Sequence, residues 1–282
     1  AWSCNCRVLW TYREVDDMMT LDTQTPGIVY AGDRDIAVWV LRFILEQGIR
    51  PLALLIPAAE KATHSDDLIS LCDYLRDDLI LRGTTFRGRS GLAILRSLAP
   101  DYIICVHFPY LVPKAVLQIP KAGVLNLHPA WLPYNRGWHT PTWAILEGTP
   151  YGATLHFMAE ELDSGDIIHR KELDILPEDT ADTLYRRVKH LELDVFREAW
   201  PSLLAGSPPR TPQDPNGGTS HRREALFSPE IQEIEMNETA RSGDLINRVR
   251  ALTTNRIDEA AYFVRDGKRY RVRVQITVEN CP

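Results

Sequence analysis

The chain has 282 residues, 44% of them hydrophobic and 25% charged, with a formal net charge of −6 at pH 7. This composition is ordinary for a globular protein, and no stretch approaches the roughly 18 apolar residues of a membrane span. The acidic balance argues against a general nucleic-acid surface, and five cysteines without a CxxC pair indicate neither a zinc site nor a disulfide framework. We therefore expect no metal and a reducing, cytoplasmic location.

The length suits one large domain with a smaller appendage. Residues 1–26 have no clear helical or strand period and lack the long apolar core of a secretory signal. We expect them to be an extension of unclear role, with a natural start at Met18 or Met19. The main domain is predicted over residues 27–205, and residues 206–282 are predicted to form a linker and a small β-hairpin subdomain.

A strand–helix–strand unit opens the main domain. A buried strand is predicted at 27–31, a helix at 35–47 that Gly48 ends, and a second strand at 51–56. Such units predict an α/β fold with a parallel sheet and right-handed crossovers. The single Gly32 after the first strand is not a GxGxxG motif, so no dinucleotide cofactor is indicated.

An amphipathic helix capped by Ser65 is predicted at 65–80, and a strand at 102–106 follows another helix. The loop 83–91 between the two helices is basic and contains Arg87 and Arg89. These arginines are candidates for holding an anionic part of a substrate, such as a diphosphate. A solvated loop is the simpler explanation for either residue taken alone.

The most informative strand is predicted at 123–128. Asn126 and His128 are two residues apart and therefore point to the same face, and Pro129 ends the pairing because it has no N–H to donate. The amide and the imidazole thus lie together at the carboxyl end of a buried strand, where α/β sheets bind ligands. A turn at Asp163, followed by a strand, can bring a carboxylate back to the same place.

The loop 131–139 is rich in aromatic and basic side chains. Aromatic faces bind bases or sugars, and arginine binds phosphate or carboxylate, so the loop is a candidate substrate site. Packing of Trp131 and Trp138 against the body of the protein is the alternative. In the next strand, at 152–158, His156 is interpreted as a structural residue.

A long helix is predicted from about residue 180, because apolar residues recur at helical spacing. The region 207–220 contains four prolines and two glycines and is predicted to be a linker or an extended crossing segment. A short helix at 240–252 is expected to turn Leu245, Val249 and Leu252 inward.

A hairpin with an Asp266-Gly267 turn closes the chain, with strands predicted at 262–265 and 268–277. Tyr270 and the apolar residues alternating with it are expected to form a buried face. An exposed hairpin edge is a ready pairing surface, so a homodimer through this hairpin is a further possibility.

Three motifs in order carry a family resemblance: Asn126-Leu127-His128, then Leu132-Pro133-Tyr134-Asn135-Arg136-Gly137, then Asp163-Ser164-Gly165. They resemble the signature of the folate-dependent formyltransferases, which include methionyl-tRNA, glycinamide ribonucleotide and nucleotide-sugar enzymes. The resemblance implies a Rossmann-like, mostly parallel sheet (the formyltransferase fold) with a small C-terminal β-rich subdomain. It also implies 10-formyltetrahydrofolate as donor substrate and an amine as acceptor, with no metal.

In such an enzyme Asn126 and protonated His128 would stabilise the oxyanion, and Asp163 would accept the proton of the amine. The resemblance further implies folate contacts along the loop 107–113, although core packing explains its apolar residues equally well. The cofactor candidates are Phe108, Pro109, Tyr110, Leu111 and Leu162.

The acceptor is less clear than the donor. The loop at residues 132–137, called the motif loop below, looks more like that of the sugar N-formyltransferases. A nucleotide-linked amino sugar of polysaccharide biosynthesis is therefore the preferred acceptor. The expected substrate contacts are Trp131, Tyr134, Arg136, Arg87 and Arg89. Methionyl-tRNA is the alternative acceptor, and a non-catalytic folate-binding or assembly module is the second alternative. The residues that would contact tRNA phosphates are Arg265, Lys268, Arg269, Arg271 and Arg273, which otherwise form the polar side of a hairpin.

Overall fold

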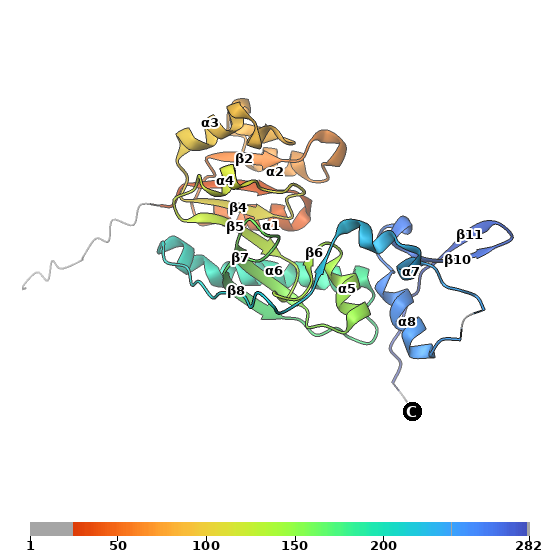
Figure 1. Cartoon of the computed structure of the whole chain (residues 1–282). Helices are drawn as coiled ribbons and strands as arrows, with labels where there is room; N and C mark the ends of the chain where they lie inside the picture. Colours follow the sequence, from red (N-terminus) through yellow and green to blue (C-terminus); the bar gives the residue numbers. More distant parts are fainter. Residues whose placement is uncertain (1–24, 238, 281–282) are drawn as a thin grey trace, which may run out of the picture.

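A seven-stranded sheet forms the centre of the main domain (Figure 1). The computed structural model describes residues 25–237 and 239–280, so nearly all of the predicted extension at 1–26 lies outside the described residues. The strand order is β3-β2-β1-β4-β5-β7-β8, and the first five pair in parallel while β7 and β8 pair antiparallel. This arrangement confirms the predicted mostly parallel α/β fold. The strands are β1 (Ile28–Gly32), β2 (Ala53–Ile56), β3 (Ile80–Arg82), β4 (Tyr102–Val106), β5 (Gly123–His128), β7 (Gly152–Phe157) and β8 (Ile167–Glu172).

Helices cover both faces of this sheet and divide its core into two layers. On one face, Ile104 and its neighbours pack with α1 (Arg34–Glu46) and α6 (Ala181–Leu204). On the other face, Ile103 packs with α3 (Arg89–Leu98). Successive side chains of a strand point to opposite faces, which explains why the central strands are apolar throughout. The other helices are α2 (Ser65–Leu71), α4 (Lys114–Leu117), α5 (Thr140–Glu147), α7 (Pro229–Gln232) and α8 (Ser242–Ala251).

The helix predicted at 65–80 is too long. It ends at Leu71, and Ile80 and Leu81 belong instead to edge strand β3, where the sheet buries them. The predicted cap is also wrong, because Ser65 is the first residue of the helix and its buried hydroxyl has no hydrogen-bond partner among the described residues. The carboxylate of Asp33 instead accepts the N–H groups of Thr63 and His64 just before the helix. Among the helices in the described residues, none is both long and apolar enough to cross a membrane.

The region 207–220 is an extended crossing segment that runs back over the main domain. Thr211 forms an isolated bridge with Ile167 at the start of β8. Further along, β9 (Ser220–His221) pairs in parallel with β6 (Arg136–Gly137) in the motif loop. The crossing segment therefore contacts the motif loop before the chain continues into the C-terminal module.

The C-terminal module contains α8 and a hairpin that projects away from the main domain (Figure 1). In α8, Val249 is buried as predicted and Leu252 is buried just after the helix end, but Leu245 is 40% exposed, so the predicted inward face is wrong at that position. Helical spacing predicts a stripe of residues without telling which of them meet a partner.

The hairpin of β10 (Ala261–Arg265) and β11 (Lys268–Val272) confirms the predicted turn, because Asp266 and Gly267 both have positive φ angles. The second strand is shorter than predicted. Val272 pairs with the first residue of β10, so the ladder has no partner for the residues beyond it. Tyr270, expected to be buried, is 42% exposed.

Candidate active site

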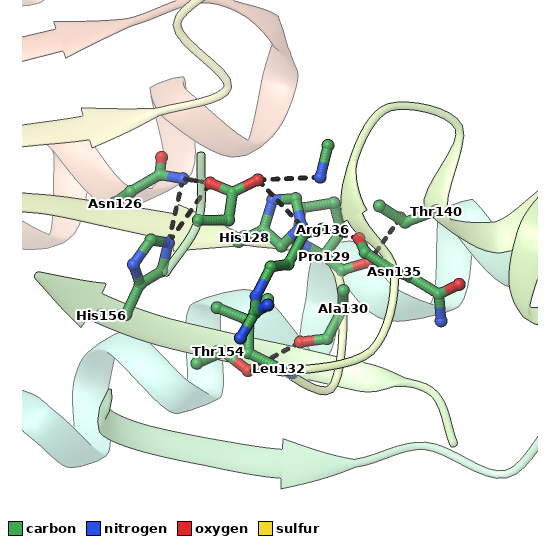
Figure 2. Close-up of polar contacts among 12 residues, drawn as sticks. Asn126, His128, Pro129, Ala130, Leu132, Asn135, Arg136, Thr140, Thr154 and His156 are labelled. Atoms are coloured by element: carbon green, nitrogen blue, oxygen red, sulfur yellow. Dashed lines mark hydrogen bonds and ion pairs between the residues drawn. The ribbon is translucent and has the colours of Figure 1, made fainter. Parts of the chain in front are cut away.

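The three predicted catalytic side chains meet at the carboxyl end of β5. Figure 2 shows Asn126 and His128 there. Nδ2 of Asn126 lies 3.3 Å from Oδ1 of Asp163, and Nε2 of His128 lies 3.6 Å from Oδ2 of the same carboxylate. Asp163 comes from the turn between β7 and β8 and is only 8% exposed. A strand end and a distant turn thus bring an amide, an imidazole and a carboxylate together.

The motif loop contributes a backbone donor to the carboxylate. The N–H of Gly137 donates to Oδ2 of Asp163 at 2.9 Å. Gly137 has a φ of +97°, and a Cβ atom there would lie 2.3 Å from the carbonyl oxygen of His221. Only glycine fits this close approach, which explains the Arg-Gly end of the motif.

Gln213, in the crossing segment, holds the turn that carries Asp163. Its Nε2 donates to the carbonyl oxygens of Asp163 and Gly165 at 2.9 and 2.7 Å, and its Oε1 accepts from Arg136 at 2.9 Å. Nothing in the sequence singles out this glutamine, because its role depends on the crossing segment's path across the site.

His156 also belongs to the site, although the sequence favoured a purely structural role. Its Nδ1 lies 2.8 Å from the carbonyl oxygen of Phe157, so Nδ1 carries the proton and Nε2 is an acceptor. That Nε2 lies 3.3 Å from Nδ2 of Asn126 and so accepts from it. The antiparallel pairing of Asn126 with His156 explains the contact, and this register is the information the sequence lacked.

The charges of the site follow from burial and from these contacts. Burial by itself raises the pKa of Asp163, but His128 and the N–H of Gly137 together hold that pKa well below its usual value. Burial lowers the pKa of His128, and Asp163 offsets this only in part. At neutral pH the site therefore contains a carboxylate and a neutral imidazole.

The neutral state of His128 changes the expectation of a protonated donor. Its Nε2 faces two acceptors, the carbonyl oxygen of Asn135 at 3.2 Å and the carboxylate of Asp163. Nε2 therefore carries the single proton of the neutral ring, and Nδ1 has a lone pair. Nδ1 can donate a hydrogen bond, in addition to the donor on Asn126, only after His128 takes up a proton.

The depressed pKa of His128 predicts a loss of stability on acidification. In the unfolded chain His128 takes up a proton near pH 6.5, and in the folded chain only at lower pH. Its contribution to the free energy of unfolding is therefore fully present above about pH 6.5 and is lost as the pH falls through the pKa of the folded state. One histidine contributes at most about 1.4 kcal/mol per pH unit. Urea unfolding between pH 8 and pH 5.5 measures this slope, which should be smaller in His128→Asn. Equal slopes for both proteins would contradict the assignment.

The predicted folate residues have two kinds of surroundings. The rings of Phe108 and Tyr110 pack against Phe86, and the Tyr110 hydroxyl accepts from the N–H of Ala58 at 3.1 Å. In the sequence, Pro109 stands between Phe108 and Tyr110. By contrast, Leu111 and Leu162 are 70% and 40% exposed, and Leu162 is the neighbour of Asp163. These two leucines are thus free to contact a ligand.

The predicted acceptor residues divide in the same way. The guanidinium of Arg170 lies 4.1 Å above the ring of Trp131, and Arg136 is bonded to Gln213. Tyr134, in the same loop, is half-buried. All three predicted residues lie in the loop 131–139, which contributes the N–H of Gly137 to the site.

Arg87 and Arg89 are not brought to the site. They follow β3, and three strands separate β3 from β5 in the sheet, a distance of about 19 Å at the usual strand spacing. Trp138, which was left out of the predicted contacts, directly follows Gly137, is 42% exposed and lies 5.4 Å from the guanidinium of Arg223. In the described part of the chain, no group of His, Cys, Asp or Glu is arranged to hold a metal ion.

Comparisons with known proteins match both parts of the chain. A family model described as "Formyl transferase" matches residues 85–200, and one described as "N-formyltransferase dimerization C-terminal domain" matches residues 229–278. A curated relative, the methionyl-tRNA formyltransferase of Geobacillus thermodenitrificans, is 32% identical over 232 residues, which is 80% of this chain and 70% of the relative.

Solved structures also match. A sugar N-formyltransferase from Shewanella superposes with a TM-score of 0.76 at 21% identity, over 90% of this chain and 99% of that one. The formyltransferase PseJ from Anoxybacillus kamchatkensis, in complex with UDP-4,6-dideoxy-4-formamido-L-AltNAc and tetrahydrofolate, is 26% identical with a TM-score of 0.52, over 71% of this chain and 88% of that one. The chain thus has the expected formyltransferase fold, and it belongs to the formyltransferase family of formyl-transferring enzymes.

Proposed function

We propose that this enzyme transfers the formyl group of 10-formyltetrahydrofolate to the primary amine of a nucleotide-linked amino sugar. The observation that carries the proposal is the buried carboxylate of Asp163, ionised at neutral pH and 3.3 Å from the amide of Asn126. The buried free thiols of Cys72 and Cys105 support a reducing cytoplasm as the place of the reaction.

The reaction needs a base, an oxyanion donor and a path for the two protons that the ammonium loses. Asp163 accepts a proton from the substrate ammonium, so that the amine nitrogen can attack the formyl carbon. The Nδ2 of Asn126 donates to the formyl oxygen as it becomes an oxyanion. Its present contacts, at 3.3 Å, are long enough to be exchanged for this one. The carbon–nitrogen bond to the folate then breaks. The ammonium loses two protons in all: one passes through Asp163 and His128 to the leaving nitrogen, and the other is released to solvent.

Three observations support a sugar nucleotide as acceptor. The fold of the chain spans 99% of the Shewanella sugar enzyme but its sequence matches only 70% of the methionyl-tRNA enzyme. PseJ, whose structure contains a formylated UDP-sugar and tetrahydrofolate, is related at 26% identity. Beside Gly137, the exposed Trp138 with Arg223 above it suits a sugar or base together with a phosphate.

Methionyl-tRNA remains the second candidate because the curated relatives have that name. The basic residues of the hairpin favour it only weakly. Arg269 and Arg271 lie 4.0 and 5.0 Å above the ring of Tyr262, and Arg271 also donates to the carbonyl oxygen of Ala260. These arginines thus stabilise the module itself. A non-catalytic module has less support, because the interacting carboxylate, amide and imidazole are what a catalyst needs.

The test supplies 10-formyltetrahydrofolate with two acceptor sets, a panel of nucleotide-linked amino sugars and methionyl-tRNA, and detects the formylated product by mass spectrometry. Formylation of a sugar nucleotide alone is the expected result. Formylation of the tRNA alone would overturn the proposed acceptor. Bound folate with no product from either set would also overturn it and would indicate a different amine.

We also propose that the protein is a homodimer through its C-terminal hairpin. Of twelve large hydrophobic side chains exposed in the described residues, seven lie between 229 and 280. Such a concentration is typical of an interface, and a C-terminal dimerization model matches this region.

Replacing Val264, 47% exposed on β10, by Asp is expected to convert the dimer to a monomer. A charge at the centre of an apolar interface is not solvated there, whereas a charge at its rim is tolerated. Light scattering after size exclusion measures the mass, with Lys268→Asp in the same hairpin as the control. A wild-type monomer, or a dimer that survives Val264→Asp, would contradict the proposal.

A further inference from the structure

His107 begins the loop 107–113, the predicted folate loop, and anchors it to the interior of the protein through contact with a buried carboxylate. It is the first residue after β4, and the preceding pair Val106 and Leu127 places it beside His128 of the neighbouring strand. Strand alternation predicts that the side chain of His107 points to the layer of α3, opposite to that of Val106. Instead its φ of +50° turns the imidazole towards α6. A non-glycine residue pays for this left-handed conformation with strain, so its contacts must hold it there.

Those contacts are made by two residues of α6. Nε2 of His107 lies 2.8 and 3.1 Å from the two carboxylate oxygens of Glu192, which is completely buried. Nδ1 of His107 lies 3.0 Å from the hydroxyl oxygen of Tyr185. Tyr185 and Glu192 are seven residues apart, and thus two turns apart on one side of the helix. A buried carboxylate is costly unless it is paired, so this arrangement is strongly coupled.

The next residues of the loop are held on the opposite layer. Phe108 packs edge-on against Phe86 with ring centroids 5.4 Å apart, and Tyr110 is held by Ala58 and by the ammonium of Lys61, 5.3 Å from its ring centroid. The loop is therefore fixed to both layers of the core, and the reversal at His107 is what sends Phe108 to the layer of α3.

We propose that His107, fixed by Glu192 and Tyr185, is a positioning residue that sets the binding geometry of the formyl donor. The inference rests on the proposed folate donor but not on the identity of the acceptor. The buried pair of His107 and Glu192 fixes the position of residues 108–111 relative to β4. The loop and the catalytic strand β5 then contact the same donor molecule in a fixed geometry. Loosening the pair moves the loop while Asn126 and Asp163 keep their own contacts.

The test measures tetrahydrofolate binding by calorimetry on the whole protein without acceptor, well below the unfolding temperature. Glu192→Gln keeps the shape but removes the charge, and we expect at least about tenfold weaker binding, since small displacements of a positioning group have effects of this size. Donor KM should rise in parallel, with acceptor KM unchanged. The control is Glu198→Gln, because Glu198 lies on the same helix and bonds His169 at the same 2.8 Å, but is half-exposed.

Two further variants keep the test decisive if Glu192→Gln does not fold. Tyr185→Phe removes one hydroxyl, and His107→Gly accepts the left-handed backbone without the imidazole. Both should weaken tetrahydrofolate binding. Unchanged binding in a folded variant, with only a lower unfolding temperature, would show a purely structural role and overturn the inference. A wild-type protein that does not bind tetrahydrofolate would instead overturn the proposed donor.

Discussion

Replacing Asp163 by Asn is expected to lower kcat by about 10²–10⁴-fold, the range over which a positioned base contributes to proton transfer. The carboxylate is the ionised group that can take the proton of the attacking amine. Asparagine has the same shape but cannot accept that proton. Tetrahydrofolate binding should change little, because four of the five predicted donor contacts lie in the loop after β4 and asparagine keeps the shape of the turn that carries the fifth, Leu162. Steady-state kinetics with a competent acceptor and calorimetry with tetrahydrofolate measure the two quantities.

The substitution also has a structural cost that must be separated from the chemical one. The two carboxylate oxygens accept from Asn126 and from the N–H of Gly137, whereas an amide has one oxygen and leaves one donor unpaired. An unpaired buried donor costs about 1–3 kcal/mol. Asp166→Asn is the control, since Asp166 lies three residues further along, is partly exposed and faces Arg210 at 3.7 Å. A folded Asp163→Asn with nearly wild-type kcat would remove the base assignment.

The parts of the site that the sequence predicted are those that depend on short-range geometry. Strand alternation places Asn126 and His128 together, and Pro129 ends the strand beside them. Asp163 was found through the motif order, since no local pattern distinguishes a catalytic aspartate from a turn aspartate. Residues whose role depends on pairing between distant segments were missed. His156 needs the antiparallel register of β7 against β5, and Gln213 needs the path of the crossing segment.

Long-range arrangement also explains where the structure departs from the sequence. Arg87 and Arg89 were expected to contact substrate because the strand order was unknown, and three strands lie between β3 and β5. The helix predicted at 65–80 ends at Leu71, and the residues after it form turns and a short 3₁₀ helix at Asp77–Leu79. Of the predicted helix only Ile80 joins the edge strand, where it pairs with Leu54 of β2, and apolar spacing alone did not distinguish these fates. The protonation state of His128 depends on its burial, which no sequence pattern reports.

Replacing Asn126 by Ala is expected to lower kcat by about 10²–10³-fold, the cost of removing one oxyanion donor. The reason differs from that for Asp163, since alanine removes a donor and leaves the base in place. Asp163 keeps the N–H of Gly137 and stays ionised, so the variant should retain the acid limb of the wild-type pH–rate profile. His156 loses its donor, because its Nε2 accepts from the amide of Asn126, and that Nε2 is then left 3.6 Å from Oδ1 of Asp163.

The double variant Asn126→Ala with Asp163→Asn decides whether the two groups act in one step. Their side chains touch at 3.3 Å, and groups that act together on one transition state lose catalysis non-additively. We therefore expect the double variant to be slower than Asp163→Asn by about tenfold or less, well short of the full effect of Asn126→Ala alone. Steady-state kinetics on the four proteins measure this coupling. A fully multiplicative loss would mean that the amide and the carboxylate work independently, and the shared oxyanion and proton-transfer step would have to be abandoned.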